Sequence, residues 1–321
     1  MKIQRRGLIA ASLGLAAPAF AQEAFPTRPV NVVVPWGPGG PTDAFARIIS
    51  QKLSTDLGQP FLVDNRVGAN GTIGMAFAAR ARPDGYTVVI APNSTYAVAP
   101  HLYQLPYNND RDFVGVGLLV SMPIFMLVPR NSPATTLAEY IALARRPNSR
   151  LTYANASVGA TSHLATEMLL QTANLEVLEV NYRGGGPAIQ AVLAGEAGML
   201  FMPAAAVMGF IRSGELRALG VASTERSPLA PQVPTFREQG LPDVEIVEHV
   251  AMLAPSGTPS AILARLNEAS RAALRAPDMQ ARLDALAVTP ETRPMAEWTA
   301  YAAEQSAKWG AVVRSRNIRV Q

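Results

Sequence analysis

The sequence predicts an α/β protein of two domains with mostly parallel sheets. Apolar runs typical of strands alternate with helical patterns along most of the 321 residues, as in chains built from strand–helix units. Several strand-to-helix junctions are rich in glycine. About 300 residues remain once an N-terminal export signal is set aside, and chains of that length usually divide into two domains.

The first 21 residues have the pattern of an export signal. Basic residues precede an apolar stretch over 7–17, which is too short to span a bilayer, and Ala19-Phe20-Ala21 is a small-residue cleavage site. Arg5-Arg6 also fits a twin-arginine signal. We therefore expect a periplasmic protein exported by the Sec or the twin-arginine route.

Charge and cysteine content exclude several classes of protein. The whole chain has 28 Lys and Arg against 24 Asp and Glu. Without the three basic residues of the export signal the balance is 25 against 24. The sequence has no run of basic residues interleaved with aromatic ones, the pattern typical of nucleic-acid binding. The chain has no cysteine, which excludes disulfides, thiolate metal sites and cysteine nucleophiles.

Each predicted element is an apolar run or a helical stripe bounded by turn residues. The strands are expected at Val30–Val34, Phe61–Val63, Thr87–Ala91, Leu151–Tyr153, Leu178–Asn181 and Ala218–Val221, and the helices near 43–56, 72–81, 259–275, 278–286 and 295–315. Ile124–Pro129 and Val250–Pro255 are apolar runs that stop at proline. We interpret these two runs as crossings between domains, which would place a ligand cleft between them.

The loop Gly37–Asp43 follows the first strand and opens a helix. Backbone N–H groups at such a junction, with the positive end of the helix dipole, favour an anion. Thr42 and Asp43 could cap the helix. A purely structural turn is the alternative, and a dinucleotide loop is disfavoured because Thr42 replaces the third glycine of G-x-G-x-x-G.

Three further glycine- or hydroxyl-rich loops open helices in the same way. They are Asn65–Gly74, Ser157–Glu167 and Asn181–Pro187, and their hydroxyls and Arg183 could bind a carboxylate. His163 and Glu167 lie four apart on one helical face, but two ligands are too few for a metal site. A serine–histidine nucleophile is also disfavoured, so we expect neither metal nor cofactor.

An ordered set of motifs spans the chain: Pro35…Pro38-Gly39-Gly40…Asp43, Asn65-Arg66…Gly68…Gly71…Gly74, Pro83-Asp84-Gly85-Tyr86-Thr87, Ser162-His163-Leu164…Glu167, Tyr182-Arg183-Gly184…Pro187-Ala188, Gly214–Leu219, Val233–Pro242 and Leu253–Pro259. This ordered set resembles the Bug family, the TctC-like extracytoplasmic solute receptors of tripartite tricarboxylate transporters. Each motif is weak alone, and their order makes the resemblance specific.

The resemblance implies a two-lobed periplasmic-binding-protein fold, type II-like, that closes over a small organic carboxylate. The two predicted crossings divide the chain into residues 22–124 and 250–321 as lobe 1 and 125–249 as lobe 2. The implied ligand-binding residues are Gly39, Gly40, Thr42, Asp43, Asn70 and Gly71 from lobe 1 and Ser157, Thr161 and Ser162 from lobe 2. Membrane transporter subunits are the implied partners, and we expect a monomer.

The chain departs from the family pattern mainly in lobe 2. Gln190 stands where the family commonly has an aspartate, Met202-Pro203 where it often has Asp-Asn, and His249 where it usually has a tryptophan. Met202 and His249 are therefore expected to line the pocket, although His249 could instead be a buried structural residue. We expect a less polar or aromatic carboxylate, or a dicarboxylate with its second charge near His249.

Together these observations favour a solute receptor rather than an enzyme, because the sequence contains no complete catalytic triad, metal set or phosphate loop. The sequence is also compatible with two alternatives. One is a receptor that delivers its ligand-bound form to a signalling kinase, and the other is an exported enzyme.

Overall fold

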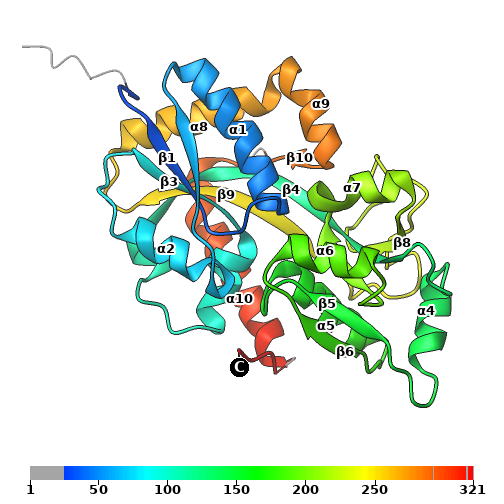
Figure 1. Ribbon diagram of the computed structural model, residues 1–321. Helices are drawn as coiled ribbons and strands as arrows, with labels where there is room; N and C mark the ends of the chain where they lie inside the picture. Colours follow the sequence, from blue (N-terminus) through cyan, green and yellow to red (C-terminus); the bar gives the residue numbers. More distant parts are fainter. Residues whose placement is uncertain (1–24, 292, 316, 321) are drawn as a thin grey trace, which may run out of the picture.

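The computed structural model describes residues 25–291, 293–315 and 317–320, so the predicted export signal over 1–21 lies outside the described residues. Two α/β lobes lie side by side (Figure 1). Among the described helices, none combines the length and the apolar character needed to cross a membrane.

The sheet of the first lobe has the strand order β10-β4-β9-β3-β1-β2. β1 pairs in parallel with β2 and β3, whereas β9 pairs antiparallel with both β3 and β4. The strands are β1 (Val30–Val34), β2 (Phe61–Asn65), β3 (Thr87–Pro92), β4 (Phe113–Pro129), β9 (Val247–Pro255) and β10 (Thr289–Pro290).

β4 is long enough to belong to both lobes. Its first part, to Pro123, pairs with β9, and its second part, from Ile124, pairs with β7 (Leu200–Pro203) and β8 (Leu216–Val221) of the second lobe. A parallel pair, β5 (Thr152–Asn155) and β6 (Leu178–Asn181), joins them through a bridge between Tyr153 and Met199. Both apolar runs interpreted as crossings are therefore strands.

The prediction of mostly parallel sheets is wrong. The βαβ units make β1–β2, β1–β3 and β5–β6 parallel, but the long strands β4 and β9 run antiparallel to their neighbours. Strand direction depends on which strands become neighbours, and periodicity within one strand carries no information about that choice.

Most helices begin and end within a few residues of the predicted bounds. α1 starts earlier than expected because Pro41 occupies its first position, where a missing N–H has no cost. The helices are α1 (Pro41–Leu57), α2 (Thr72–Ala79), α3 (Asn109–Asp112), α4 (Leu137–Ala144), α5 (Thr161–Thr172), α6 (Gly185–Leu193), α7 (Ala204–Ser213), α8 (Ser260–Arg275), α9 (Pro277–Leu286) and α10 (Trp298–Ser315), with short 3₁₀ or π turns η1 (Ala69–Gly71), η2 (Ser94–Val98), η3 (Ala99–His101) and η4 (Met295–Glu297).

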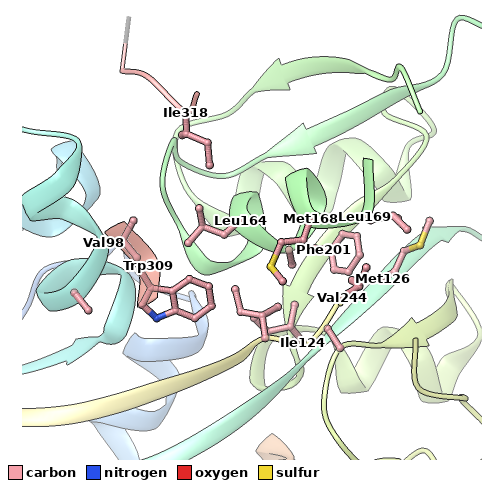
Figure 2. Packing of buried hydrophobic residues seen from close by; sticks show 14 of the residues in the cluster. Val98, Ile124, Met126, Leu164, Met168, Leu169, Phe201, Val244, Trp309 and Ile318 are labelled. Carbon is pink, nitrogen blue, oxygen red and sulfur yellow. The ribbon is translucent and has the colours of Figure 1, made fainter. Parts of the chain in front are cut away.

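The C-terminal helix α10 joins the cores of the two lobes. Trp309 of α10 is buried in a cluster with Val98 of η2 in the first lobe and Leu164 of α5 in the second (Figure 2). The same cluster continues to Ile124 of β4 and to Phe201 of β7. The two lobes therefore share one continuous apolar core on this side of the sheet.

Candidate ligand-binding cleft

A cavity of about 420 Å³ lies between the two lobes, a size that suits a small organic molecule. Each of its walls is a segment at the end of a strand, as expected for α/β sheets. The lining residues are Pro35, Trp36, Gly37, Gly40, Pro41, Thr42, Val67, Gly68, Ala69, Asn70, Gly71 and Pro92 of the first lobe, Ala156, Ser157, Val158, Ala160, Ser162, Asn181, Tyr182, Arg183, Gly184, Gly185, Met202 and Pro203 of the second, and Glu248 of β9.

Five helices begin at this cavity. The residue that precedes the first turn of each lines the wall: Gly40 for α1, Gly71 for α2, Ala160 for α5, Gly184 for α6 and Pro203 for α7. None of these five ends has a side-chain cap among the described contacts. Free N–H groups and the positive ends of several helix dipoles therefore favour an anion here.

Asn70 connects the two lobes at the cavity. Its backbone is left-handed, with φ of 51°, and its side chain is 2% exposed. Its Nδ2 donates to the Ser94 carbonyl at 3.3 Å in the first lobe and to the Gly159 carbonyl at 3.1 Å in the second. Its Oδ1 accepts no hydrogen bond within the described structure, so it can accept one from a ligand.

Gly71 is required by close packing behind the same wall. Its φ is +87°, and an added Cβ would lie 2.6 Å from Oγ1 of Thr95 and 3.1 Å from Cβ of Pro35. Thr95 Oγ1 in turn accepts a hydrogen bond from the indole of Trp36 at 2.9 Å. Sequence reasoning missed Trp36, although its position between the first strand and the glycine loop was a usable signal.

Seven of the eleven predicted binding residues line the cavity: Gly40, Thr42, Asn70, Gly71, Ser157, Ser162 and Met202. The other four lie outside the wall: Gly39, Asp43, Thr161 and His249. Met202 is one of the departures from the family pattern. Its side chain lies about 3.5 Å from the position that a Cβ would occupy if Gly185 had one, and it forms part of an apolar surface facing the cavity.

Asp43 stabilises the first loop instead of facing the cavity. It is 2% exposed, and its carboxylate accepts hydrogen bonds from the Gly39 N–H at 3.0 Å, from Asn65 at 2.8 Å and from Arg47 at 2.9 Å. Burial alone would raise its pKa, but these hydrogen bonds from Arg47, Asn65 and Gly39 outweigh burial and hold the pKa below the ordinary value.

We expect Asp43→Asn to lower the free energy of unfolding by about 1–3 kcal/mol, because the amide would present an N–H to groups that already donate. The stability from Asp43 is present above the unfolded pKa of 3.8 and is lost as the pH falls through the lowered folded pKa. Urea unfolding of the variant at pH 7 measures this effect. An unchanged stability with a large loss of ligand affinity would instead place Asp43 in contact with ligand.

Thr161 and His163 support the wall formed by the β5–α5 loop. The Thr161 hydroxyl donates to Oδ1 of Asn93 at 3.3 Å. Nδ1 of His163 accepts the Gly159 N–H at 3.1 Å, and its Nε2 lies 3.6 Å from Glu167. His163 is therefore a hydrogen-bonded residue of the helix. The part of the chain that the structure describes contains no group of three or more His, Cys, Asp or Glu arranged to hold a metal ion.

His249 does not line the cavity, contrary to the expectation from the sequence. Its Nε2 lies 3.7 Å from Glu291, and its ring meets Tyr301 edge-on at 5.9 Å. Burial lowers its pKa, and Glu291 offsets this only in part. Neighbouring side chains on a strand point to opposite faces, so it is Glu248 that faces the cavity.

Glu248 is the functional candidate that sequence reasoning missed. It is 5% exposed and lines the cavity, and its Oε1 accepts no hydrogen bond within the described structure. Burial raises its pKa to about 7, and hydrogen bonding to the Thr161 hydroxyl offsets this only in part. An acidic residue at the start of the strand Val247–Pro255, which is apolar from Val250 onward, was the available signal.

Fold and cavity together define a two-lobed ligand-binding protein with a cleft suited to an anion. Residues 45–318 match the family model described as the tripartite tricarboxylate transporter family receptor. The chain belongs to this family, and its resemblance to the Bug-type receptors is confirmed.

Known relatives cover most of the chain. A protein of Pseudomonas sp. strain P51, described as the UPF0065 protein in the tcbD-tcbE intergenic region, is 40% identical over 83% of this chain and 80% of its own length. Protein BugT of Bordetella pertussis is 32% identical over 98% of this chain and 97% of its own.

Solved structures with bound ligands share the fold. MatC from Rhodopseudomonas palustris, solved with malate, has a TM-score of 0.84 at 34% identity and covers 90% of this chain and 100% of that one. A second R. palustris protein, solved with adipate, has a TM-score of 0.88 at 31% identity, with 92% and 99% covered.

Proposed function

We propose that this protein captures a small organic carboxylate in the cavity between its lobes and delivers it to the membrane subunits of a tripartite tricarboxylate-type transporter. The observation that carries the proposal is the convergence of five helix N-termini on one cavity. Malate and adipate, bound in two relatives, are dicarboxylates of a size that the cavity can hold.

The binding residues that we propose are the seven predicted ones that line the cavity, together with Trp36 and Glu248. Backbone N–H groups at the starts of α1, α5 and α6, with the hydroxyls of Thr42, Ser157 and Ser162, would bind the ligand carboxylate. Trp36 and Met202 would contact its apolar part. A second charge near His249 is no longer part of the proposal, because His249 faces away from the cavity.

The lobe division that we propose keeps residues 22–124 and 250–321 in lobe 1 and 125–249 in lobe 2. Pairing of β4 changes from β9 to β7 and β8 at Pro123–Ile124, which supports the first boundary. β4 and the segment that leads into β9 connect the lobes and can act as a hinge, and closure would be stabilised by ligand contacts with both lobes. The protein would be exported to the periplasm by the Sec or the twin-arginine route and would act there as a monomer.

A thermal-shift screen tests this function. The purified protein, stripped of ligand by unfolding and refolding, is heated with malate, adipate and benzoate, each at increasing concentration. A ligand at a hundred times its Kd stabilises by about 2.7 kcal/mol, a shift of several degrees. We expect at least one acid to shift the Tm while remaining chemically unchanged. Turnover of the acid would support an enzyme, and no shift with any acid would contradict the proposal.

A further inference from the structure

Glu248 is a buried carboxyl at the ligand cavity that anion binding by helix N-termini does not explain. It lies on β9, opposite Met122 of β4, with 5% of its surface exposed. Within the described structure it forms no ion pair, and its Oε1 accepts no hydrogen bond. A buried carboxylate without a counter-charge is costly, whereas a buried carboxylic acid is much less so.

The groups around Glu248 do not supply a positive charge. The Thr161 hydroxyl of α5 lies on one side, next to the amide of Asn93, which bonds the Val247 carbonyl at 3.2 Å. Tyr96 of η2 is neutral, since burial raises its pKa well above the ordinary value. Among the described residues lining the cavity Arg183 is the one cation, and it is exposed on the second lobe. His249 and Glu291 lie on the opposite face of β9.

An ionised Glu248 would repel the anion that the helix N-termini attract. A protonated Glu248 has no charge and carries one O–H donor, which a ligand oxygen can accept. The bound anion would also favour the protonated form, because a negative charge nearby disfavours a second one. The same buried group is therefore compatible with an anionic ligand only when it holds a proton.

We propose that Glu248 is protonated in the ligand-bound receptor and donates its O–H to an oxygen of the ligand, so that the protein takes up a proton with each anion it captures at neutral or alkaline pH. This inference rests on the proposed function, since it requires an anionic ligand in the cavity. The only covalent bond that forms is the O–H bond of Glu248, and its proton comes from the solvent.

Thermodynamic linkage between proton binding and ligand binding gives the expected change of Kd with pH. Because burial raises the pKa of the free carboxyl to about 7, binding above that pH requires uptake of a proton. Affinity then falls about tenfold for each pH unit, until the pKa of the bound state is reached. Because the free carboxyl is already half ionised at pH 7, we expect Kd to rise about fiftyfold between pH 7 and pH 9.

Isothermal titration with adipate and with malate between about pH 6.5 and pH 9 tests the coupling, since the carboxyl groups of both acids are ionised throughout this range. Titrations at pH 8 in two buffers of different ionisation enthalpy count the protons taken up. We expect close to one proton per ligand for the wild type. Glu248→Gln, which keeps a donor but cannot titrate, is expected to bind with an affinity independent of pH and to take up none.

Glu291→Gln is the matched control, because it removes a carboxylate on the other face of β9 and leaves Glu248 in place. This variant is expected to keep the roughly fiftyfold rise of Kd between pH 7 and pH 9. Loss of the pH dependence in Glu291→Gln but not in Glu248→Gln would assign the proton to the His249–Glu291 pair and overturn the proposal. Binding by the wild type with no pH dependence would also overturn it, while the proposed function would stand.

Infrared spectroscopy, first without and then with ligand, tests the protonation of Glu248 separately from the proposed capture of a carboxylate. The infrared carbonyl band of a protonated carboxylic acid, taken as the difference between wild type and Glu248→Gln, is expected at pH 6 and absent at pH 9 without ligand. Adipate or malate is expected to restore it at pH 8. Lack of this band at pH 6 would contradict a protonated Glu248. Failure of every carboxylate to bind at pH 6.5 would instead overturn the proposed function, and with it the coupling.

Discussion

Glu248→Gln is expected to gain about 3 kcal/mol of stability relative to the wild type when the pH is raised from 4 to 8, without any ligand. The folded pKa of Glu248 is raised from its ordinary value of 4.5 to about 7 because the carboxyl is buried. A group with a raised folded pKa contributes stability that is fully present below the unfolded pKa and is lost as the pH rises through the folded pKa. The loss therefore falls between pH 4.5 and 7, and a shift of this size corresponds to about 3 kcal/mol.

Urea unfolding of both proteins at several pH values measures this difference. Glu245→Gln is the control, because Glu245 lies three residues earlier and its carboxylate pairs with Arg237 at the surface at 2.7 Å. Its stability relative to the wild type is expected to change by less than about 1 kcal/mol over the same range. A Glu248→Gln difference that stays constant with pH would mean that Glu248 has the same pKa in the folded and the unfolded protein, which would contradict a pKa raised by burial.

Trp309→Ala is expected to lower the free energy of unfolding by about 3–5 kcal/mol. The indole is 1% exposed and packs between Val98 of the first lobe and Leu164 of the second (Figure 2). Its Nε1 donates to Gln305 at 3.1 Å, so the truncation also removes the partner of that side chain. A cavity at this point would affect the cores of both lobes at once.

Chemical unfolding monitored by far-UV circular dichroism, a signal that does not rely on the fluorescence of the deleted tryptophan, measures the loss of unfolding free energy. Glu304→Ala, an exposed change on the same helix, is the control and is expected to stay within about 0.5 kcal/mol of the wild type. If Trp309→Ala lost less than 1 kcal/mol, α10 would contribute little to holding the two lobes together, and the shared core would be energetically unimportant.

Local patterns were sufficient to predict the strand–helix junctions. The loop between β1 and α1 could be predicted because an apolar run, glycines and a helix start follow one another within Val32–Asp43. These features depend on backbone conformations that individual residues favour. The glycine loops at the starts of α1 and α2 could therefore be predicted from the residues alone, whereas the individual binding residues came from comparison with the family pattern, and seven of these line the cavity.

Side-chain direction within those loops was harder to predict. Asp43 lies three residues after Gly40, in the first turn of α1, yet its carboxylate turns back to the Gly39 N–H and to Asn65 of β2. Asn65 lies 22 positions further along the chain, so this contact exists only after β1 and β2 pair. A polar residue in a binding loop can form hydrogen bonds within the protein or to the ligand, and local sequence does not distinguish the two roles.

The sequence by itself determined the α/β class, the family and the glycine loops that surround the cavity, because these follow from local propensity and from ordered motifs. Tertiary structure alone decided that Glu248 faces the cavity while His249 faces Glu291, and that Trp309 joins the two cores. The physical reason is that neighbouring residues on a strand point to opposite faces, and which face borders the cavity depends on the packing of β9 between β3 and β4.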